Sequence, residues 1–345
     1  MFILLSILIF GLIIAIHEFG HYIAAKAFGV GVPEFAIGMG PKLLKKQGKE
    51  TLYSLRAIPI GGFCALDGDD NKVQGGKSLF TKPLWKRIVI FLAGSTMNII
   101  AGFLLFLIVA GNMSTLPTTT FAGFNEDVPL EDRQGLLPGD RFYRIDGLRV
   151  YQVSNVLMFL DIHAGDTVDV IVIRDDRQVL LNDFPIQREL PRFGFQFDRI
   201  ESPTFADRFG YALNDTRDFM RQFPLTIRMF ASGQAGMQDI SSVVGIVDVM
   251  NQAGATAENA RVAAMRMVML TAVISISVAV INLLPIPGLD GGRIFLMLIT
   301  TGIEKVTRRK VNPQIESYIN TAGLLLLFSF MIYMIFQDIV QIASR

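Results

Sequence analysis

The sequence is poor in cysteine, tryptophan and histidine, and it carries little charge. Of its 345 residues one is cysteine, one is tryptophan and three are histidine, and 18% are Asp, Glu, Lys or Arg. The single Cys64 excludes an internal disulfide and a zinc–thiolate cluster. A net charge of +1 argues against a nucleic-acid partner. Hydrophobic residues make up 51% of the chain, which favours a membrane protein.

The sequence contains four stretches that are long and uncharged enough to cross a bilayer as helices. The first begins at Met1 and continues towards Ala25, and the others are Ile88–Gly111, Met267–Leu289 and Ser317–Gln337. Charges interrupt every apolar run between Asn112 and Arg261. The N-terminus has neither the basic flank nor the cleavage site of a signal peptide, so we expect the first stretch to be retained as a span.

Lysine is absent from one long segment and concentrated in short loops. Residues 112–261 contain fourteen Arg, no Lys and twenty-one acidic residues, whereas residues 26–87 contain eleven Lys and Arg against five acidic residues. The last loop contains Lys305, Arg308, Arg309 and Lys310. The positive-inside rule therefore predicts that both basic loops are cytoplasmic. The acidic segment and both termini are then extracytoplasmic.

Two of the three histidines are four residues apart, in the sequence His-Glu-Phe-Gly-His at positions 17–21. Residues at this spacing share one face of a helix, so His17 and His21 can bind one zinc ion. Glu18 is beside them, where it can take a proton from water at the metal. Residues 1–16 are uncharged and cover about 24 Å of a bilayer core that is about 30 Å thick. Ionisable groups at that depth usually mark function, although a helix end facing water is the simpler alternative.

A catalytic zinc ion usually has three protein ligands and one open position. Residues 22–32 contain neither His nor Glu, and Glu34 follows Pro33, a poor context for a rigid ligand. Asp290 is the better candidate. If the spans alternate in direction, the inner ends of the first and third spans share one side of the membrane. Asp290 would close the third span after a break rich in Pro and Gly. A helix cap in the interface is the alternative explanation.

Two further polar residues are candidates for a role. Asn98 is a side-chain amide in the otherwise apolar second span, where it could stabilise an oxyanion or hydrogen-bond between helices. His163, the third histidine, is in the acidic segment, and we expect it to be a surface or core residue.

Outside the spans the pattern predicts β structure in two places. Residues 35–41 and 51–63 resemble strands around a polar turn, which predicts a β-hairpin whose edge could bind an extended peptide, or else an ordinary loop. Short β-type runs alternate with turns over 116–197, with one helix at 152–163, and residues 202–264 are helical. The predicted fold is a polytopic α-helical membrane protein with four spans, a cytoplasmic-side β-hairpin and an inserted extracytoplasmic α+β domain.

At these residues the chain resembles the site-2 protease family of intramembrane zinc metalloproteases, in particular its bacterial branch typified by RseP and RasP. The resemblance rests on the His-Glu-Phe-Gly-His motif, on Asn-Leu-Leu-Pro-Ile-Pro-Gly-Leu-Asp-Gly-Gly at 282–292 and on the order of the four spans. It implies that His17, His21 and Asp290 are the zinc ligands and that Glu18 is the catalytic base.

The resemblance also implies domains and partners. It makes residues 35–63 similar to a membrane-re-entrant hairpin and gives the chain a single PDZ domain. The expected domains are 1–111 with two spans, 115–198 as the PDZ-like domain, 199–262 as a helical region and 263–345 with the last two spans. The expected function is cleavage of single-span membrane proteins, such as anti-sigma factors and remnant signal peptides, in the stress response of a bacterial inner membrane. Expected partners are these substrates, membrane lipid and a PDZ peptide ligand.

Two other classes of function stay open on the sequence. A membrane scaffold whose PDZ domain binds peptides would use the zinc structurally, and a structural site needs a fourth ligand, such as Glu34. A zinc transporter would need further acids or histidines along a path. Apart from Glu18, the spans offer only Asp290.

Overall fold

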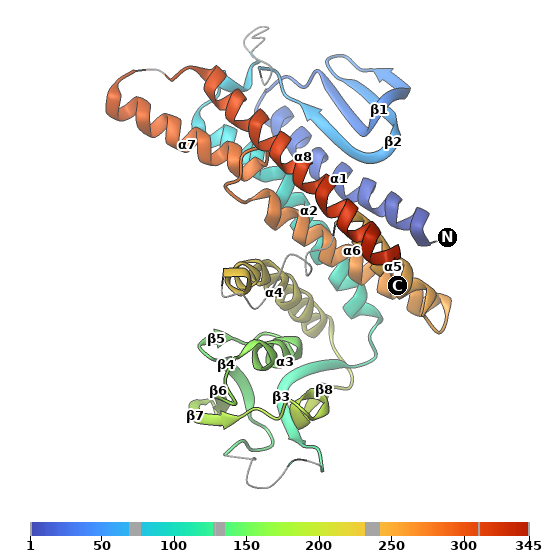
Figure 1. The fold of residues 1–345 in the computed structure, drawn as a ribbon, viewed down its shortest axis with the longest axis vertical. Helices are drawn as coiled ribbons and strands as arrows, with labels where there is room; N and C mark the ends of the chain where they lie inside the picture. The colour runs from blue at the N-terminus through green and yellow to red at the C-terminus, as the bar shows by residue number, and fades with distance from the viewer. Residues whose placement is uncertain are drawn as a thin grey trace. The chain divides into compact units, whose positions relative to one another are not determined.

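The chain forms two compact units in a computed structural model, which describes residues 2–68, 77–126, 128, 135–231, 242–309 and 311–343. Unit 1 comprises Met1–Leu105 and Gly236–Arg345, and unit 2 comprises Phe106–Ala235 (Figure 1). Each unit has its own core, and we describe each by itself.

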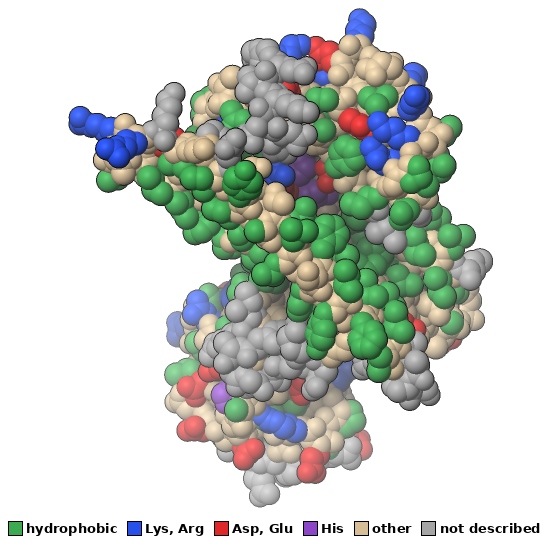
Figure 2. Space-filling view, turned by 45° about the horizontal axis from the view of Figure 1, so that its top comes forward, with side chains coloured by type: hydrophobic (Ala, Val, Ile, Leu, Met, Phe, Trp, Pro, Cys, Tyr) green, Lys and Arg blue, Asp and Glu red, His purple; other side chains and the backbone are tan. Residues whose placement is uncertain are grey.

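Four helices of the described chain are long and apolar enough to cross a membrane, which agrees with the number of spans predicted. They are α1 (Phe2–Ala27), α2 (Leu84–Asn112), α6 (Ala260–Asn282) and the segment Ile315–Val340 of α8 (Pro313–Ala343). Hydrophobic side chains cover much of the helical surface in Figure 2. Leu12 and Leu326, for example, are exposed. Such an exposed apolar surface suits a membrane protein, in which lipid covers the helices.

The third span ends earlier than the sequence predicted. Helix α6 ends at Asn282, and Asp290 is the first residue of a further helix, α7 (Asp290–Thr307). The expectation that Asp290 closes the third span is therefore wrong. The intervening loop contains Pro285 and Pro287, which have no N–H to continue the helix.

Glycine lets this loop lie against the first turn of α7. A Cβ on Gly291 would be 2.2 Å from the carbonyl oxygen of Leu283, and one on Gly292 would be 2.0 Å from that of Ile286. The loop also packs on α8, since a Cβ on Gly323 would be 2.2 Å from the carbonyl oxygen of Pro287. These contacts fix the backbone that carries Asp290.

The strands β1 (Glu34–Gln47) and β2 (Leu52–Ala65) are longer and more elaborately paired than the predicted hairpin. Next to the turn the two strands pair in antiparallel register, beginning with Gln47 opposite Leu52. The start of β1 pairs twice, because Glu34 lies opposite both Leu52 and Ala65. The register runs parallel in the first case and antiparallel in the second. Gly38 has a φ of 83°, which allows β1 to bend between these pairings.

Unit 2 contains a mixed α+β fold. Its sheet has the strand order β7-β6-β4-β3-β8, with β5 paired to β4. The predicted helix at 152–163 is present as α3 (Val153–Ile162), with Gln152 and Asn155 forming a capping box. The remaining elements are β3 (Leu116–Phe124), β4 (Arg141–Ile145), β5 (Leu148–Arg149), β6 (Thr167–Arg174), β7 (Arg177–Pro185), η3 (Pro191–Gly194) and β8 (Phe195–Ile200).

Helix α4 (Phe205–Ala231) is fastened to α3 by buried polar side chains. The amide of Asn155 donates to Asp218 at 2.6 Å, and the guanidinium of Arg221 donates to the Asn155 oxygen at 2.7 Å. Gln152 donates to the carbonyl oxygen of Tyr211 at 3.1 Å. Helix α4 therefore belongs to unit 2.

Helix α5 (Val243–Ala255) belongs to unit 1, where Met250 packs with Phe10, Ile13 and Met267. Its N-terminus is capped from α8, because Asp338 accepts hydrogen bonds from the backbone N–H groups of Ser242 and Gly245 at 2.7 and 3.0 Å. The predicted helical region 199–262 is thus divided between the two units. A short 3-10 helix, η1 (Leu79–Thr81), precedes α2.

Candidate metal centre

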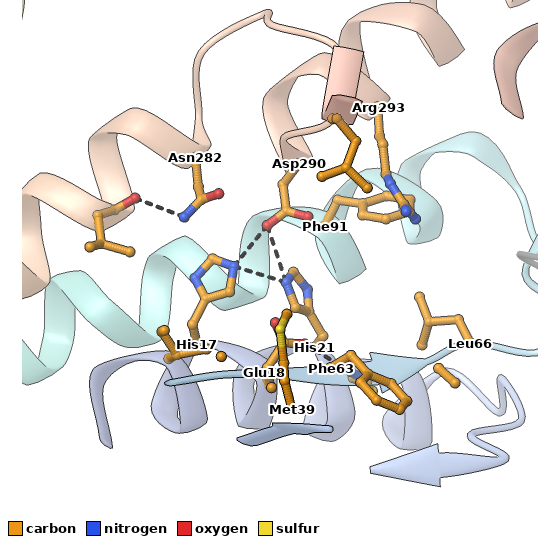
Figure 3. Close-up of a pocket in the computed structure, with 18 residues that line it drawn as sticks. His17, Glu18, His21, Met39, Phe63, Leu66, Phe91, Asn282, Asp290 and Arg293 are labelled. Atoms are coloured by element: carbon orange, nitrogen blue, oxygen red, sulfur yellow. Dashed lines mark hydrogen bonds and ion pairs between the residues drawn. The ribbon is translucent and has the colours of Figure 1, made fainter. Parts of the chain in front are cut away.

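Two histidines of α1 and the first residue of α7 converge in unit 1 (Figure 3). The Nε2 atoms of His17 and His21 are 3.2 Å apart, and Oδ2 of Asp290 lies 3.0 and 3.1 Å from them. Both histidines are 6% exposed. The three possible ligand atoms lie within 4.8 Å of one another, with no fourth His, Cys, Asp or Glu in the group among the residues that the structure describes.

Helix α2 supports both imidazole rings with one face. Nδ1 of His21 lies 2.8 Å from the carbonyl oxygen of Ile90, and Nδ1 of His17 lies 3.5 Å from the side-chain amide of Asn98. Between these positions, a Cβ on Gly94 would be 2.4 Å from Nε2 of His21 and 2.8 Å from Cε1 of His17. Positions 90, 94 and 98 share one helix face. The absence of a side chain at 94 therefore makes room for the rings.

The tautomer of His21 follows from its partner. A carbonyl oxygen can only accept, so Nδ1 of His21 carries the hydrogen and donates it to Ile90. The lone pair of the ring is then on Nε2, which faces His17 and Asp290. A histidine that binds a metal ordinarily has this arrangement.

Glu34, the other candidate for the third ligand, is engaged elsewhere. Its carboxylate accepts hydrogen bonds from Ser54 at 2.7 Å, Arg56 at 2.9 Å and Lys42 at 3.0 Å. Partial burial alone would raise the pKa of Glu34, but these three donors outweigh burial and lower the pKa. Glu34 is therefore a structural group of the β1–β2 sheet.

Glu18 points to the same cavity and is held by the sheet. Its Oε2 accepts a hydrogen bond of 2.9 Å from the backbone N–H of Cys64 in β2. The cavity has a volume of about 600 Å³. It is lined by Ile14, His17, Glu18, His21, Met39, Gly61, Gly62, Phe63, Cys64, Ala65, Leu66, Phe91, Val278, Asn282, Gly288, Asp290, Arg293 and Leu324.

Two polar residues of this cavity were not singled out from the sequence. Asn282 is the last residue of α6, and Arg293 follows Asp290 by one helical turn and lies over the ring of Phe91 (Figure 3). An amide within a long apolar stretch was the available signal for Asn282. The same signal drew attention to Asn98, which is fully buried and does not line the cavity.

The third histidine lies in unit 2, as expected. Nδ1 of His163 is 3.6 Å from a carboxylate oxygen of Asp146, and the side chain is partly exposed.

The donor set fits zinc. Two imidazole nitrogens and one carboxylate oxygen are a usual combination for a catalytic zinc ion, whose remaining position stays open to water or substrate. The second nitrogen of His21 has a fixed partner. Glu18, the only other acid among the described residues that line the cavity, is outside the group of ligand atoms. The arrangement is suited to hydrolysis at a metal ion.

Comparison with known proteins agrees with this chemistry. Residues 5–330 match the family described as Peptidase family M50. A protein of Clostridium acetobutylicum, provisionally named a zinc metalloprotease, is 33% identical over 98% of this chain and 97% of its own length. A protein of Clostridium perfringens with the same provisional name is 31% identical over 99% of each chain. A third, from Mesorhizobium japonicum, is 26% identical over 95% of each chain.

Proposed function

We propose that this chain, a zinc metalloprotease of peptidase family M50 (the site-2 protease family), hydrolyses peptide bonds of membrane-embedded substrates at the cavity of unit 1. One observation carries the proposal. The side chains of His17, His21 and Asp290 meet beside Glu18, in a unit built mainly of helices long enough to cross a membrane.

His17 and His21 would hold the zinc ion through Nε2, and Asp290 would hold it through a carboxylate oxygen. When bound, zinc supplies Lewis-acid assistance to the attack of water on the scissile carbonyl group. Glu18 takes a proton from the attacking water at its carboxylate and passes it to the nitrogen of the leaving amine.

Asn282 is a better placed donor for the oxyanion than Asn98. Its side chain lines the cavity, whereas that of Asn98 lies behind His17. The NH2 group of Asn282 donates to the carbonyl oxygen of Val278 at 2.9 Å and has a second hydrogen. That hydrogen is available for charge that develops on the scissile carbonyl oxygen.

The substrate enters as an extended segment, because a helix uses its carbonyl groups internally and hides the bond to be cut. Residues 62–65 of β2 line the cavity and pair with β1, so a substrate strand can add to the sheet beside Glu18. Met39, Leu43, Leu44 and Ile58 of this sheet are exposed apolar side chains. Their exposure supports a sheet that dips into the membrane.

The remaining expectations from the resemblance complete the proposal. The substrates are single-span proteins of the anti-sigma factor or remnant signal peptide type. The strands and α3 of unit 2 form a PDZ domain on the extracytoplasmic side of a bacterial inner membrane, where it binds peptides and limits access by bulky substrates. The excess of Lys and Arg in residues 26–87 supports this orientation.

Cysteine labelling tests the orientation. In a Cys64→Ser background, Gln47→Cys should react only with a reagent on the cytoplasmic side, and Asp176→Cys only with one outside. Equal reactivity of both positions from one side would reject the four-span topology.

The catalytic assignment is tested with Glu18→Gln. This variant keeps the three ligands and loses the proton acceptor, so it should bind zinc normally and fail to cut a single-span reporter substrate. Glu34→Gln is the matched control and should retain both properties. Normal turnover by Glu18→Gln would remove Glu18 from the mechanism.

A further inference from the structure

Asn98 has an unsatisfied hydrogen-bonding group next to a ligand of the candidate metal. Its side chain is fully buried in unit 1, where Nδ2 lies 3.5 Å from Nδ1 of His17. Its Oδ1 has no hydrogen-bond partner among the residues that the structure describes. Buried amide oxygens nearly always have a donor, so the missing partner calls for an explanation.

The proton of His17 supplies that explanation. Binding of zinc through Nε2 places the lone pair of the ring on Nε2, and Nδ1 then carries a hydrogen that needs an acceptor. An NH2 group at Nδ1 would set two donors against each other. The oxygen and nitrogen of an amide are exchanged by a half-turn about the last side-chain bond, and their assignment rests on the hydrogen bonds made. A half-turn of the Asn98 amide presents Oδ1 to His17.

The other histidine shows the same arrangement. Nδ1 of His21 donates to the carbonyl oxygen of Ile90, which is on the same face of α2 as Asn98. With the Asn98 amide turned in this way, helix α2 offers an acceptor to each ring, a main-chain oxygen to His21 and a side-chain oxygen to His17. The backbone at Asn98 is itself fixed, because its carbonyl oxygen accepts a hydrogen bond of 2.8 Å from Ser275 of α6.

We propose that Asn98 is a positioning residue, which accepts a hydrogen bond from Nδ1 of His17 through its side-chain oxygen and holds Nε2 towards the metal. The inference rests on the proposed zinc site and replaces the role of oxyanion donor that the sequence suggested. A residue of this kind raises the zinc affinity, whereas an oxyanion donor acts on the reaction after zinc and substrate are bound.

The exchange of the amide for a carboxylate separates the two roles. Asn98→Asp keeps an acceptor of nearly the same shape beside His17 but has no NH2 group to donate. Asn98→Ala removes the acceptor as well. The zinc affinity of the purified full-length protein is measured by competition with a chelator, and kcat is measured at saturating zinc with a single-span reporter.

Asn98→Ala should weaken zinc binding by about 10- to 100-fold, the usual effect of losing the hydrogen-bond partner of a ligand. Asn98→Asp should restore the affinity close to that of the unaltered protein and should retain turnover. Asn282→Asp is the contrasting variant and should bind zinc normally while losing kcat. Ser275→Ala breaks the bond to the Asn98 backbone and leaves the acceptor, so it controls for a packing defect.

The outcomes that overturn the inference are specific. Unchanged zinc affinity in Asn98→Ala would show that His17 needs no acceptor there. Normal zinc affinity with lost kcat in Asn98→Asp would return Asn98 to the oxyanion role. Thermal unfolding of each variant with and without zinc identifies a folding failure. Absence of zinc binding by the unaltered protein would reject the proposed function itself, a result distinct from both.

Discussion

In unit 2, the sheet and α3 enclose a continuous apolar core that contains Phe121, Phe159 and Phe195. The buried polar side chains between α3 and α4, such as Asn155 and Asp218, are hydrogen-bonded to each other. In unit 1, by contrast, the buried apolar residues form separate small clusters, and buried His17 and His21 converge on a cavity.

The difference distinguishes buried polar groups that stabilise the fold from buried polar groups that can bind a ligand. Asn155 in unit 2 uses its side-chain oxygen and nitrogen within the protein, where they join two helices. In unit 1 the Nε2 atoms of two histidines face a carboxylate in a cavity that admits further atoms. Buried polar groups that are mutually satisfied specify a fold, whereas those that share an open space can bind and react.

The strongest test of this contrast replaces, one at a time, the two acids that were candidates for the third ligand. Asp290→Ala should remove a ligand from the open site and should lower zinc occupancy and cleavage together, by at least about 100-fold. Glu34→Ala should leave zinc occupancy nearly unchanged, because Glu34 bonds only to groups of the β1–β2 sheet in the described structure. Metal analysis and cleavage assays on both variants decide the question. The reverse result would make Glu34 the ligand.

A smaller loss is expected from Gly94→Ala. The added Cβ would lie 2.4 Å from Nε2 of His21, which is too close, so the rings or α2 must move. Overpacking of this kind costs about 1–3 kcal/mol, which corresponds to roughly 5- to 150-fold in zinc affinity if the strain falls on the bound state. Gly111→Ala, on the same helix, is the control because a Cβ there meets no atom of the described residues within 4 Å. Equal zinc affinities in the two variants would remove Gly94 from the support of the site.

Features that depend on local pattern could be predicted from the sequence. Uncharged length predicted four spans, and the helix predicted at 152–163 is present as α3 to within one residue at each end. The spacing of His17 and His21 indicated that they share one helix face. Asp290 could be chosen because span parity places distant residues on one side of a membrane, and its carboxylate does lie beside both rings.

Other features that depend on contacts between distant residues could not be predicted. The double pairing of β1 joins Glu34 to residues 18 and 31 positions away, and the hydrogen bond from Cys64 to Glu18 joins a sheet to a helix. Neither leaves a periodic signal. The start of α7 at Asp290 depends on glycines that fit against a preceding loop, a contact that composition does not reveal.

Phe159→Ala tests the structural side of the comparison. Phe159 is fully enclosed in the core of unit 2, so its truncation should lower the stability of that unit by about 3–5 kcal/mol. Hydrogen exchange of the β6 amides should rise accordingly. Zinc affinity should stay unchanged, because the three proposed ligands belong to unit 1. A parallel loss of zinc affinity would show that the two units are energetically coupled.

A response to pH is expected from Asp215 of α4. Burial, together with the nearby charge of Asp218, raises the pKa of Asp215 to about 7. In the unfolded chain an aspartate has a pKa of about 4. Between about pH 4 and pH 7 the folded unit therefore binds a proton that the unfolded chain has released. Its stability should fall as the pH rises through this window, by up to about 1.4 kcal/mol per pH unit, and should level off above it.

Asp215→Asn should remove this dependence and stabilise unit 2 most at pH 8, where the carboxylate of the unaltered protein is charged and buried. Asp207, at the start of the same helix, should make the stability depend on pH in the opposite direction. Hydrogen bonds from the Thr204 side chain and backbone lower the pKa of Asp207, so the stability that it contributes is lost as the pH falls. Asp207→Asn should therefore destabilise at pH 8. Hydrogen exchange of β6, corrected for the intrinsic rate at each pH, measures both variants, and equal pH slopes in Asp215→Asn and the unaltered protein would show that the buried carboxylate carries no such cost.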